Sequence, residues 1–386
     1  MAKKMDKKSP NVPNLRFPGF EGEWDIVHLG DLCDKIGDGI HSTPKYNDFG
    51  DYSFINGNNF VEGKIVISES TKRVTKAEAE KHNAHTLTEN TILLSINGTI
   101  GSLALYNGES VMLGKSACYI NPPKTQNRLF IFYQLSANRI NNYFISELTG
   151  STIKNLSLKS IRNTILYLPA NKEQKKIAKF FSFLDKRIST QSKIIEKYES
   201  LIKGIVDLLL HCENYPFKRI NLGSLCSIKK GEQINTSKLL DKGIYYVMNG
   251  GITPSGYHTE YNTESGTISI SEGGNSCGYV QFNFSKFWSG GHCYTLNEIS
   301  SQILNEYLYF YLKSQEKSIM ALRVGSGLPN IQKRDLEMIE VQYPDYIRQK
   351  EVVKTLSLLS DKIKIENSLL SVLLKQKQYL LNQMFI

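Results

Sequence analysis

Two long segments of the chain carry apolar residues at spacings that alternate between four and three. The first seam runs from Ile177 to Leu209, and the second runs from Val352 to Met384. This spacing is typical of a helix whose partner is another helix. We therefore predict helices over 171–213 and 346–386, paired antiparallel as a coiled coil of roughly 50 Å. The predicted seam residues are Ile177, Phe181, Leu184, Ile188, Ile195, Val352, Leu356, Leu359, Ile363 and Leu370.

The sequence before each helix is a diverged copy of the other. WDIVHLGDLC at 24–33 returns as FKRINLGSLC at 217–226, and ACYI at 117–120 returns as HCYT at 292–295. The first copy also carries an insertion that the second copy lacks. Two copies in one chain indicate a pseudo-twofold architecture with two similar sites that face one ligand.

Both copies mix short strands with helices. Runs of β-branched and aromatic residues separated by Asn-Gly pairs indicate strands, and leucine–aromatic runs at helical spacing indicate helices. Predicted strands are Tyr52–Ile55, Thr91–Ile96, Leu103–Tyr106, Ser116–Ile120 and Ile161–Leu168, and predicted helices are Leu129–Leu135 and Leu304–Leu312. Asn171 is the predicted N-cap of the first long helix. The fold class is α/β of the mixed α+β type, with a disordered basic tail (1–16), a domain (17–170), a helix (171–213), a second domain (214–345) and a second helix (346–386).

The chain is basic, with 47 Lys and Arg against 37 Asp and Glu and a formal net charge of +10. This charge suits an anionic partner such as DNA, and it is also consistent with ordinary solubility. No apolar run reaches the ~18 residues of a membrane span, and no apolar signal core follows the basic N-terminus. We therefore expect a cytoplasmic protein without membrane contact.

The motifs that suggest catalysis are incomplete. Asn121-Pro122-Pro123-Lys124 resembles the Asn-Pro-Pro-aromatic motif of DNA amino-methyltransferases, but Lys124 has no ring to stack on a flipped base. NGTIG at 97–101 is Gly-rich but lacks the Lys-Ser/Thr of a nucleotide P-loop. The six cysteines form no CxxC pair. Cys33, Cys118, Cys226 and Cys293 match in pairs across the repeat and lie in apolar contexts, which favours core residues over metal ligands, whereas Cys212 and Cys277 are left over. We predict no catalytic residue, metal site or cofactor site in this chain.

Polar and basic residues gather in loops rich in glycine and serine. Lys and Arg beside such loops suit DNA phosphates, and Asn or Lys can read base edges in the major groove. The candidate DNA-binding residues are Lys45, Asn56, Asn58, Asn59, Lys72, Arg73, Lys76, Asn97, Ser151, Thr152, Lys154, Asn249, Arg323, Ser326, Asn330 and Lys333. Any one of them equally fits an ordinary hydrophilic turn.

The chain resembles the specificity subunit of type I restriction–modification systems from about Leu15 to its end. The segments that carry this resemblance are LRFPGFEGEW (15–24), HLGDLC (28–33), FINGNNFVEGK (54–64), LLSINGTIG (93–101), GSTIKNLSLKSI (150–161), LPANKEQKKIAKFFSFLDKRI (168–188), NLGSLC (221–226), GSGLPNIQKRDL (325–336) and RQKEVVKTLSLLSDKI (348–363). The resemblance implies that each domain recognises half of a split double-stranded DNA target. It also implies that the helices act as a ruler and dock two methyltransferase subunits, through which restriction subunits join.

The resemblance implies adenine methylation and ATP-driven cleavage by the complex. S-adenosylmethionine, ATP and Mg²⁺ would then be bound by the partners, and this chain would be non-catalytic. One alternative is a stand-alone DNA-binding or scaffold protein without enzymatic partners. Another is a self-contained methyltransferase, which would need a cofactor-binding fold, and we expect neither domain-sized copy to contain one. Retained S-adenosylmethionine would favour that alternative, whereas co-purification with a methyltransferase would favour the specificity subunit.

Overall fold

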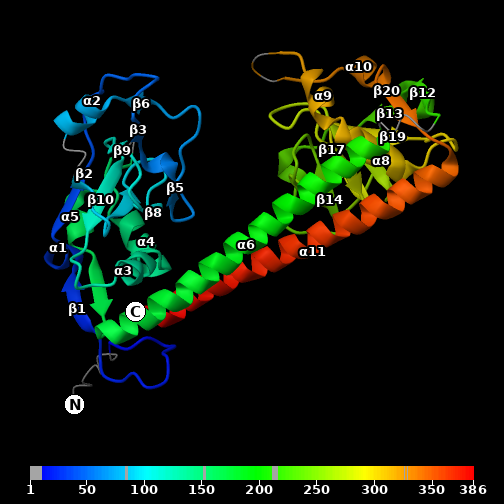
Figure 1. Cartoon of the computed structure of the whole chain (residues 1–386). Helices are drawn as coiled ribbons and strands as arrows, with labels where there is room; N and C mark the ends of the chain where they lie inside the picture. Colours follow the sequence, from blue (N-terminus) through cyan, green and yellow to red (C-terminus); the bar gives the residue numbers. More distant parts are fainter. Residues whose placement is uncertain (1–10, 83–85, 151–153, 211–215, 326, 328) are drawn as a thin grey trace. The chain divides into compact units, whose positions relative to one another are not determined.

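The computed structural model describes residues 11–82, 86–150, 154–210, 216–325, 327 and 329–386. The chain forms two compact units, one made of residues 1–191 and 369–386 and the other of residues 192–368. Each unit contains one α/β domain together with parts of two long helices, α6 (Asn171–Leu210) and α11 (Tyr346–Met384) (Figure 1). We call the part from β1 to β11 domain 1 and the part from β12 to β20 domain 2.

Domain 1 is built on a four-stranded antiparallel sheet in the order β2-β10-β7-β8. A second sheet has the order β6-β3-β9, and β1 pairs with β11. The elements are β1 (Asp25–His28), α1 (Leu29–Leu32), β2 (Lys35–Asp38), β3 (Tyr52–Ile55), η1 (Gly57–Asn59), β4 (Phe60–Val61), β5 (Lys64–Ile65), β6 (Arg73–Val74), α2 (Lys76–Lys81), β7 (Ile92–Ser95), β8 (Leu103–Leu105), β9 (Val111–Leu113), β10 (Ala117–Asn121), α3 (Arg128–Leu135), α4 (Asn138–Ser146), α5 (Leu158–Arg162) and β11 (Ile165–Leu168).

Domain 2 repeats this plan. Its main sheet has the order β13-β19-β16-β17, its second sheet has the order β15-β14-β18, and β12 pairs with β20. The elements are β12 (Lys218–Asn221), α7 (Leu222–Leu225), β13 (Ser227–Lys230), η3 (Thr236–Lys238), β14 (Tyr245–Met248), β15 (Gly256–His258), β16 (Thr267–Ser271), β17 (Val280–Asn283), β18 (Phe287–Ser289), β19 (Cys293–Asn297), α8 (Asn305–Ser314), α9 (Glu316–Ala321), α10 (Lys333–Glu337) and β20 (Glu340–Tyr343). The mixed α/β class and the internal repeat predicted from the sequence are confirmed.

Alternation along the central strands gives the main sheet two apolar faces. In β7, Ile92 and Leu94 pack into the core that contains α3 and α4, whereas Leu93 packs on the other face beneath the second sheet. Successive side chains of a strand point to opposite faces, so a strand covered on both sides has no polar face. This explains why β7 reads as a continuous apolar run in the sequence.

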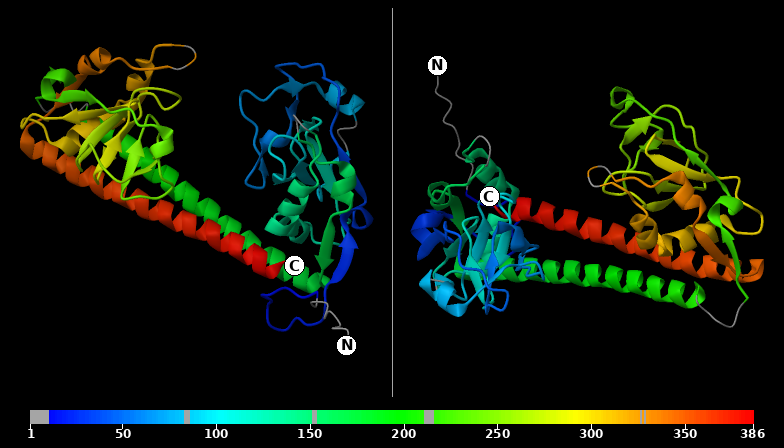
Figure 2. Two further views of the ribbon diagram at one scale, coloured as in Figure 1. Left: turned by 180° about the vertical axis from the view of Figure 1, so that it is seen from behind. Right: turned by 90° about the horizontal axis from the view of Figure 1, so that it is seen from above.

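The two long helices lie side by side and antiparallel within each unit (Figures 1 and 2). In the first unit, Phe181 of α6 stacks on Phe385, and Asp185 pairs with Lys377 at 2.5 Å. In the second unit, Val206 of α6 shares a core with Leu356 of α11. Every predicted seam residue with a described side chain is buried or half-buried. The seam is therefore the face on which the helices meet.

A buried glutamine fastens each long helix to its own domain. The Gln174 amide accepts a hydrogen bond from Asn127 N and donates to Pro169 O. Gln349, at the equivalent place, accepts from Leu304 N and donates to Pro344 O. A buried amide with both ends satisfied fixes geometry, because any shift would leave a polar group unpaired. The repeated glutamine thus sets how each helix leaves its domain.

Three local predictions are wrong. The strand predicted over 161–168 begins only at Ile165, because α5 continues to Arg162. Asn171 is the first helical residue rather than the N-cap, since the Ala170 carbonyl accepts from Glu173 N and Gln174 N. Residues 11–16 do not belong to a disordered tail: Leu15 N donates to Gln383 O, and Arg16 is ion-paired. Residues 1–10 lie outside the described part of the chain.

The Arg16–Glu173 pair gives a testable prediction. Arg16 Nε and Nη2 each donate to the Glu173 carboxylate at 2.7 Å, and Glu173 is only 1% exposed. Glu173→Gln removes the charge that balances Arg16. We therefore expect the free energy of unfolding, measured with urea, to fall by about 3 kcal/mol. The control is Arg219→Met, which breaks the exposed Arg219–Glu340 pair and should cost less than about 1 kcal/mol. Equal losses in the two variants would contradict this.

The described residues contain no helix that is long and apolar enough to cross a bilayer. They also contain no group of three or more His, Cys, Asp or Glu that could hold a metal ion. Cys118, Cys226, Cys277 and Cys293 are buried. Burial raises the pKa of the Cys226 thiol to about 12 and that of Cys293 to about 11. Cys118, Cys226 and Cys293 are core residues, as predicted, whereas Cys33, predicted alike, is half-buried.

Candidate DNA interface

In domain 1, three loops meet at one end of the main sheet. Asn56, after β3, accepts a hydrogen bond from the Ser116 hydroxyl, just before β10, at 3.0 Å. Asn97, after β7, pairs through its backbone with Asn155 of the loop that follows Gly150. Gly150 has a φ of 98°, a left-handed conformation that favours glycine. We call the site formed by Asn56, Asn97, Ser116 and Asn155 the loop end of domain 1.

The loop end of domain 2 is built in the same way. Asn249, after β14, accepts from His292 N, just before β19, at 3.1 Å. Gly273, after β16, pairs through its backbone with Asn330 of the loop that follows Gly325, whose φ is 108°. This loop end is formed by Asn249, Glu272, Gly273, His292 and Asn330. The sequence predictions Asn56, Asn97, Asn249 and Asn330 therefore come together in two equivalent sites.

The two loop ends share a backbone but differ in chemistry. In domain 1, a hydroxyl occupies the position before the central strand, and Asn97 provides an amide. In domain 2, an imidazole, His292, holds the place of Ser116, and Gly273 holds the place of Asn97, while the neighbouring Glu272 adds a carboxylate. Because a common frame carries different donors and acceptors, the two sites are suited to different sequences of the same kind of ligand.

Glu272 is the centre of a polar cluster in domain 2. Its carboxylate is paired with the Lys230 ammonium, and it lies 3.3 Å from both His292 Nδ1 and the Tyr294 hydroxyl. The Glu272 side chain is 9% exposed, whereas the His292 side chain is 58% exposed. Burial, reinforced by the nearby charge of Glu272, raises the pKa of Tyr294 to about 12. The Tyr294 hydroxyl thus keeps its proton and can donate it to the Glu272 carboxylate or to Ile331 O, each at 3.3 Å.

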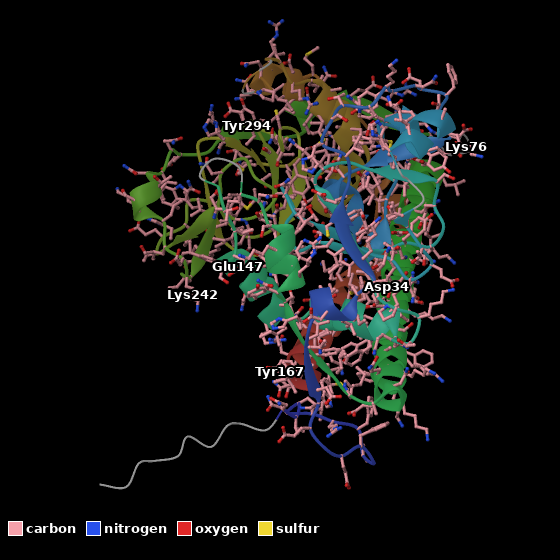
Figure 3. The ribbon with its side chains drawn as sticks, turned by 90° about the vertical axis from the view of Figure 1, so that its left-hand side faces the viewer. Asp34, Lys76, Glu147, Tyr167, Lys242 and Tyr294 are labelled. Carbon is pink, nitrogen blue, oxygen red and sulfur yellow. The ribbon has the colours of Figure 1, made fainter. Side chains whose placement is uncertain are left out.

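The insertion of domain 1 contributes a separate basic cluster. Lys72, Arg73 and Lys76 are exposed on and beside β6 and α2, and Lys45 joins them because its backbone N donates to Glu78. Figure 3 shows the Lys76 side chain at the outer edge of α2. The cluster adjoins the beginning of β3, whereas Asn56 follows its end. Four predicted basic residues are therefore grouped, but away from the loop end.

The remaining predicted residues differ in their surroundings. Asn58 is exposed, whereas Asn59 uses both ends of its amide inside the loop, accepting from Asn56 N and donating to Val66 O. We expect Asn59 to shape the loop rather than to contact a base. Lys154, Arg323 and Lys333 are exposed, with Lys333 3.5 Å from Glu337. Ser151, Thr152 and Ser326 lie outside the described residues.

A groove of about 620 Å³ adjoins the loop end of domain 1. It is lined by the Gly98–Thr99 turn, by Ile145 and Leu148 of the α4 region, and by Lys154. Its wall combines backbone, apolar side chains and one ammonium group. Such a lining suits the edge of a nucleic acid strand, because exposed backbone amides and a lysine meet phosphates while the apolar wall excludes water.

The long helix α11 carries a second apolar row outside the seam. Leu358, Ile365, Val372 and Tyr379 follow one another at intervals of seven and are 64%, 61%, 59% and 62% exposed. On α6, Leu201 and Leu208 are also seven apart and exposed. We call the four α11 residues the outer row. Large apolar side chains repeated along one helix face indicate a surface that another protein covers.

Sequence reasoning missed the Glu272 cluster and the outer row. Glu272 and His292 lie 20 residues apart, and only the antiparallel pairing of β16 with β19 brings them together. Their positions beside Gly273 and Gly291, at the places of Ile96 and Ser116 in the repeat, were the available signal. For the outer row, the signal was the strict seven-residue spacing.

The comparison with protein families assigns this architecture. The family described as "Type I restriction modification DNA specificity domain" matches residues 21–200 and again 214–375. Each match begins near the start of one α/β domain and continues into the long helix that follows it. The chain belongs to this family, as the resemblance in its sequence implied.

Individual relatives agree with this assignment. A putative type I specificity subunit of Mycoplasma pneumoniae is 34% identical over 174 residues, which cover 45% of this chain and 46% of that protein. The chain thus matches about half the length of that relative. A putative type I restriction enzyme MjaX specificity subunit of Methanocaldococcus jannaschii is 23% identical and is matched over 97% of this chain and 96% of its own.

Solved structures show the same fold. The crystal structure of a type I restriction–modification S subunit from M. genitalium superposes with a TM-score of 0.62 at 22% identity, over 97% of this chain and 99% of that one. A chain from a structure of type I R-M complex assembly superposes with a TM-score of 0.54 at 15% identity, over 96% and 98%. The repeated domains and the long helices are therefore a shared arrangement.

Proposed function

We propose that this chain is the subunit that gives a type I restriction–modification complex its DNA sequence specificity. Each domain recognises one half of a bipartite duplex target, and the long helices separate the two halves. The observation that carries the proposal is the pair of equivalent loop ends with different side chains. One frame used twice with different chemistry is what an asymmetric, two-part target requires.

The catalytic partners dock on the helices in this proposal. Two methyltransferase subunits bind the chain, and restriction subunits join through them. The outer row of α11 supports a protein partner, because four exposed apolar side chains in line are costly in water and gain free energy when they are covered. This observation favours a subunit of a complex over a stand-alone DNA-binding protein.

The chain itself contributes binding rather than chemistry. Adenine methylation and ATP-driven cleavage take place in the partners, which bind S-adenosylmethionine, ATP and Mg²⁺. The Asn121-Pro122 segment supports this division. The Asn121 side-chain amide accepts a hydrogen bond from the Thr91 hydroxyl and donates one to Thr86 O, so both of its ends already have partners within the protein. Lys124, in the position of the aromatic residue, is ion-paired with Glu89.

Selection of duplexes from a randomised pool tests this function. The full chain is incubated with the pool at low salt, and the bound fraction is sequenced. We expect two short enriched blocks separated by a constant gap of unspecified bases. A single block, or a bound fraction no different from the input pool, would contradict the proposal.

The salt dependence of binding should identify phosphate contacts. A plot of the logarithm of the DNA association constant against the logarithm of the salt concentration should have a negative slope. We expect a magnitude of ~0.9 for each phosphate that the protein neutralises. Replacing Lys72 and Arg73 together with Gln should reduce that slope by roughly two, because both side chains are exposed and available to phosphates. Lys124→Gln is the matched control, since Glu89 already pairs with this exposed lysine. Identical slopes for all three proteins would place the phosphate contacts elsewhere.

A further inference from the structure

The exposed imidazole of domain 2 has a defined orientation. His292 Nδ1 lies 3.3 Å from Glu272 Oε2, and the backbone N of His292 donates to Asn249. Glu272 is itself held on both sides, because its backbone N donates to His292 O and its backbone O accepts from Ile331 N. The ring is therefore attached to the rigid end of two paired strands.

The carboxylate also determines which ring nitrogen carries a proton. An ionised carboxylate only accepts hydrogen bonds, so Nδ1 must be the donor in this contact. In the neutral ring, Nε2 is then a bare acceptor. Nε2 lies on the edge of the ring opposite Glu272, and no other described residue forms a hydrogen bond with it. The side chain thus presents one acceptor of fixed direction to the surroundings.

The imidazole is accessible to a ligand, because more than half of the His292 side chain is exposed. Gly250, Gly273 and Gly291 adjoin His292, and a methyl group at Gly250 would come within 3.1 Å of His292 Cβ. Glycine at these places lets the neighbouring segments pack closely beside His292, which fixes the base of its side chain. Arg323 supplies an exposed positive charge at the same loop end, where Lys230 is paired with the buried Glu272 carboxylate. The site thus combines an accessible acceptor with a nearby guanidinium group.

We propose that His292 reads the exocyclic amino group of an adenine or cytosine in the half-site bound by domain 2, and that Glu272 is its positioning residue. This inference rests on the proposed function and specifies one contact within it. Adenine N6 and cytosine N4 are the amino donors of the major groove, and either can donate to an imidazole nitrogen. Domain 1 has Ser116 in the position of His292 and Ile96 in the position of Glu272, so the imidazole–carboxylate contact belongs to one half-site only.

The test repeats the selection of duplexes with three variants of the full chain. His292→Leu removes the acceptor but keeps a side chain of similar bulk, and it should fold because the residue is exposed. We expect it to lose roughly fivefold discrimination at one base pair of one block, the contribution of a single hydrogen bond. His292→Gln retains an acceptor and should preserve the preference. Melting temperatures of all three variants check that the fold is unchanged.

Glu272→Gln provides a readout that a purely structural role would not produce. An amide both donates and accepts, so it permits either imidazole tautomer and allows Nε2 to become a donor. We expect the same base pair to tolerate guanine or thymine, whose major-groove edges offer acceptors, while the other block is unchanged.

The possible results separate the two proposals. If the wild-type chain enriches two blocks and His292→Leu enriches the same blocks with equal discrimination, the contact is wrong and the proposed function stands. Uniform weakening at every position would also overturn the contact, because it would mark His292 as a phosphate ligand. Absence of enrichment by the wild-type chain would instead overturn the proposed function.

Discussion

Leu356→Asp should destabilise the chain by about 4 kcal/mol or more, whereas Leu358→Asp, two residues further along α11, should cost about 0.5 kcal/mol. Leu356 is 1% exposed and packs in the core of the second unit with Val206 and Val352, so a carboxylate there would be buried without a partner. Leu358 is 64% exposed. Circular dichroism during urea unfolding measures both effects.

The same pair of variants separates folding from assembly. Leu358 belongs to the outer row, so Leu358→Asp should fold normally yet fail to co-purify with the methyltransferase subunit. Ile365→Asp and Val372→Asp, one and two heptads along the row, should show the same defect. If Leu358→Asp assembles fully, the outer row is a solvated face. If Leu356→Asp is as stable as the wild-type chain, the assigned seam is wrong.

Four residues inserted into each long helix should lengthen the gap between the recognised half-sites. The insertions would stand before Ile188 in α6 and after Leu373 in α11, which are opposed because Asp185 pairs with Lys377. Four helical residues add ~6 Å and turn the following part by a full turn plus about 40°. This corresponds to one or two base pairs of duplex at ~3.4 Å each. We therefore expect the same two sequence blocks with one or two more unspecified base pairs between them.

Insertion into α6 alone is the control for this prediction. It displaces the α6 seam against an unchanged α11, so we expect reduced stability and weak binding rather than a clean change of the gap. Sequencing of the duplexes selected by each variant gives the gap directly. An unchanged gap in the double insertion would mean that the helices are only a docking surface and that loops set the spacing.

The long helices could be predicted from the sequence because their seam is periodic over many turns. The side chains from Ile177 to Ile195 and from Val352 to Leu370 that were assigned to the seam are buried or half-buried. The outer row has the same seven-residue spacing, and the sequence alone cannot decide which row a partner helix covers. That choice depends on three-dimensional packing, which is why the outer row was found only in the structure.

The candidate site was predictable in part for a similar reason. The loops containing Asn56, Asn97 and Asn249 could be located, because Asn-Gly and Gly-rich pairs mark the ends of strands. Contacts between strands decide whether an asparagine in such a loop is free to bind a ligand or is hydrogen-bonded within the protein. The Asn59 side chain forms its hydrogen bonds within its own loop. The Glu272–His292 contact arises only from the register in which β16 pairs with β19. Local sequence patterns mark these loops but do not pair residues across strands, so neither contact could be predicted.

Mapping of methylated adenines in cells tests the central claim most directly. The chain is co-expressed with its methyltransferase subunit, and the genome is compared with that of cells that express the methyltransferase alone. We expect methylation at sites that share one bipartite sequence and that disappear without this chain. Methylation at the same sites in its absence would contradict the claim that this chain selects the DNA sequence.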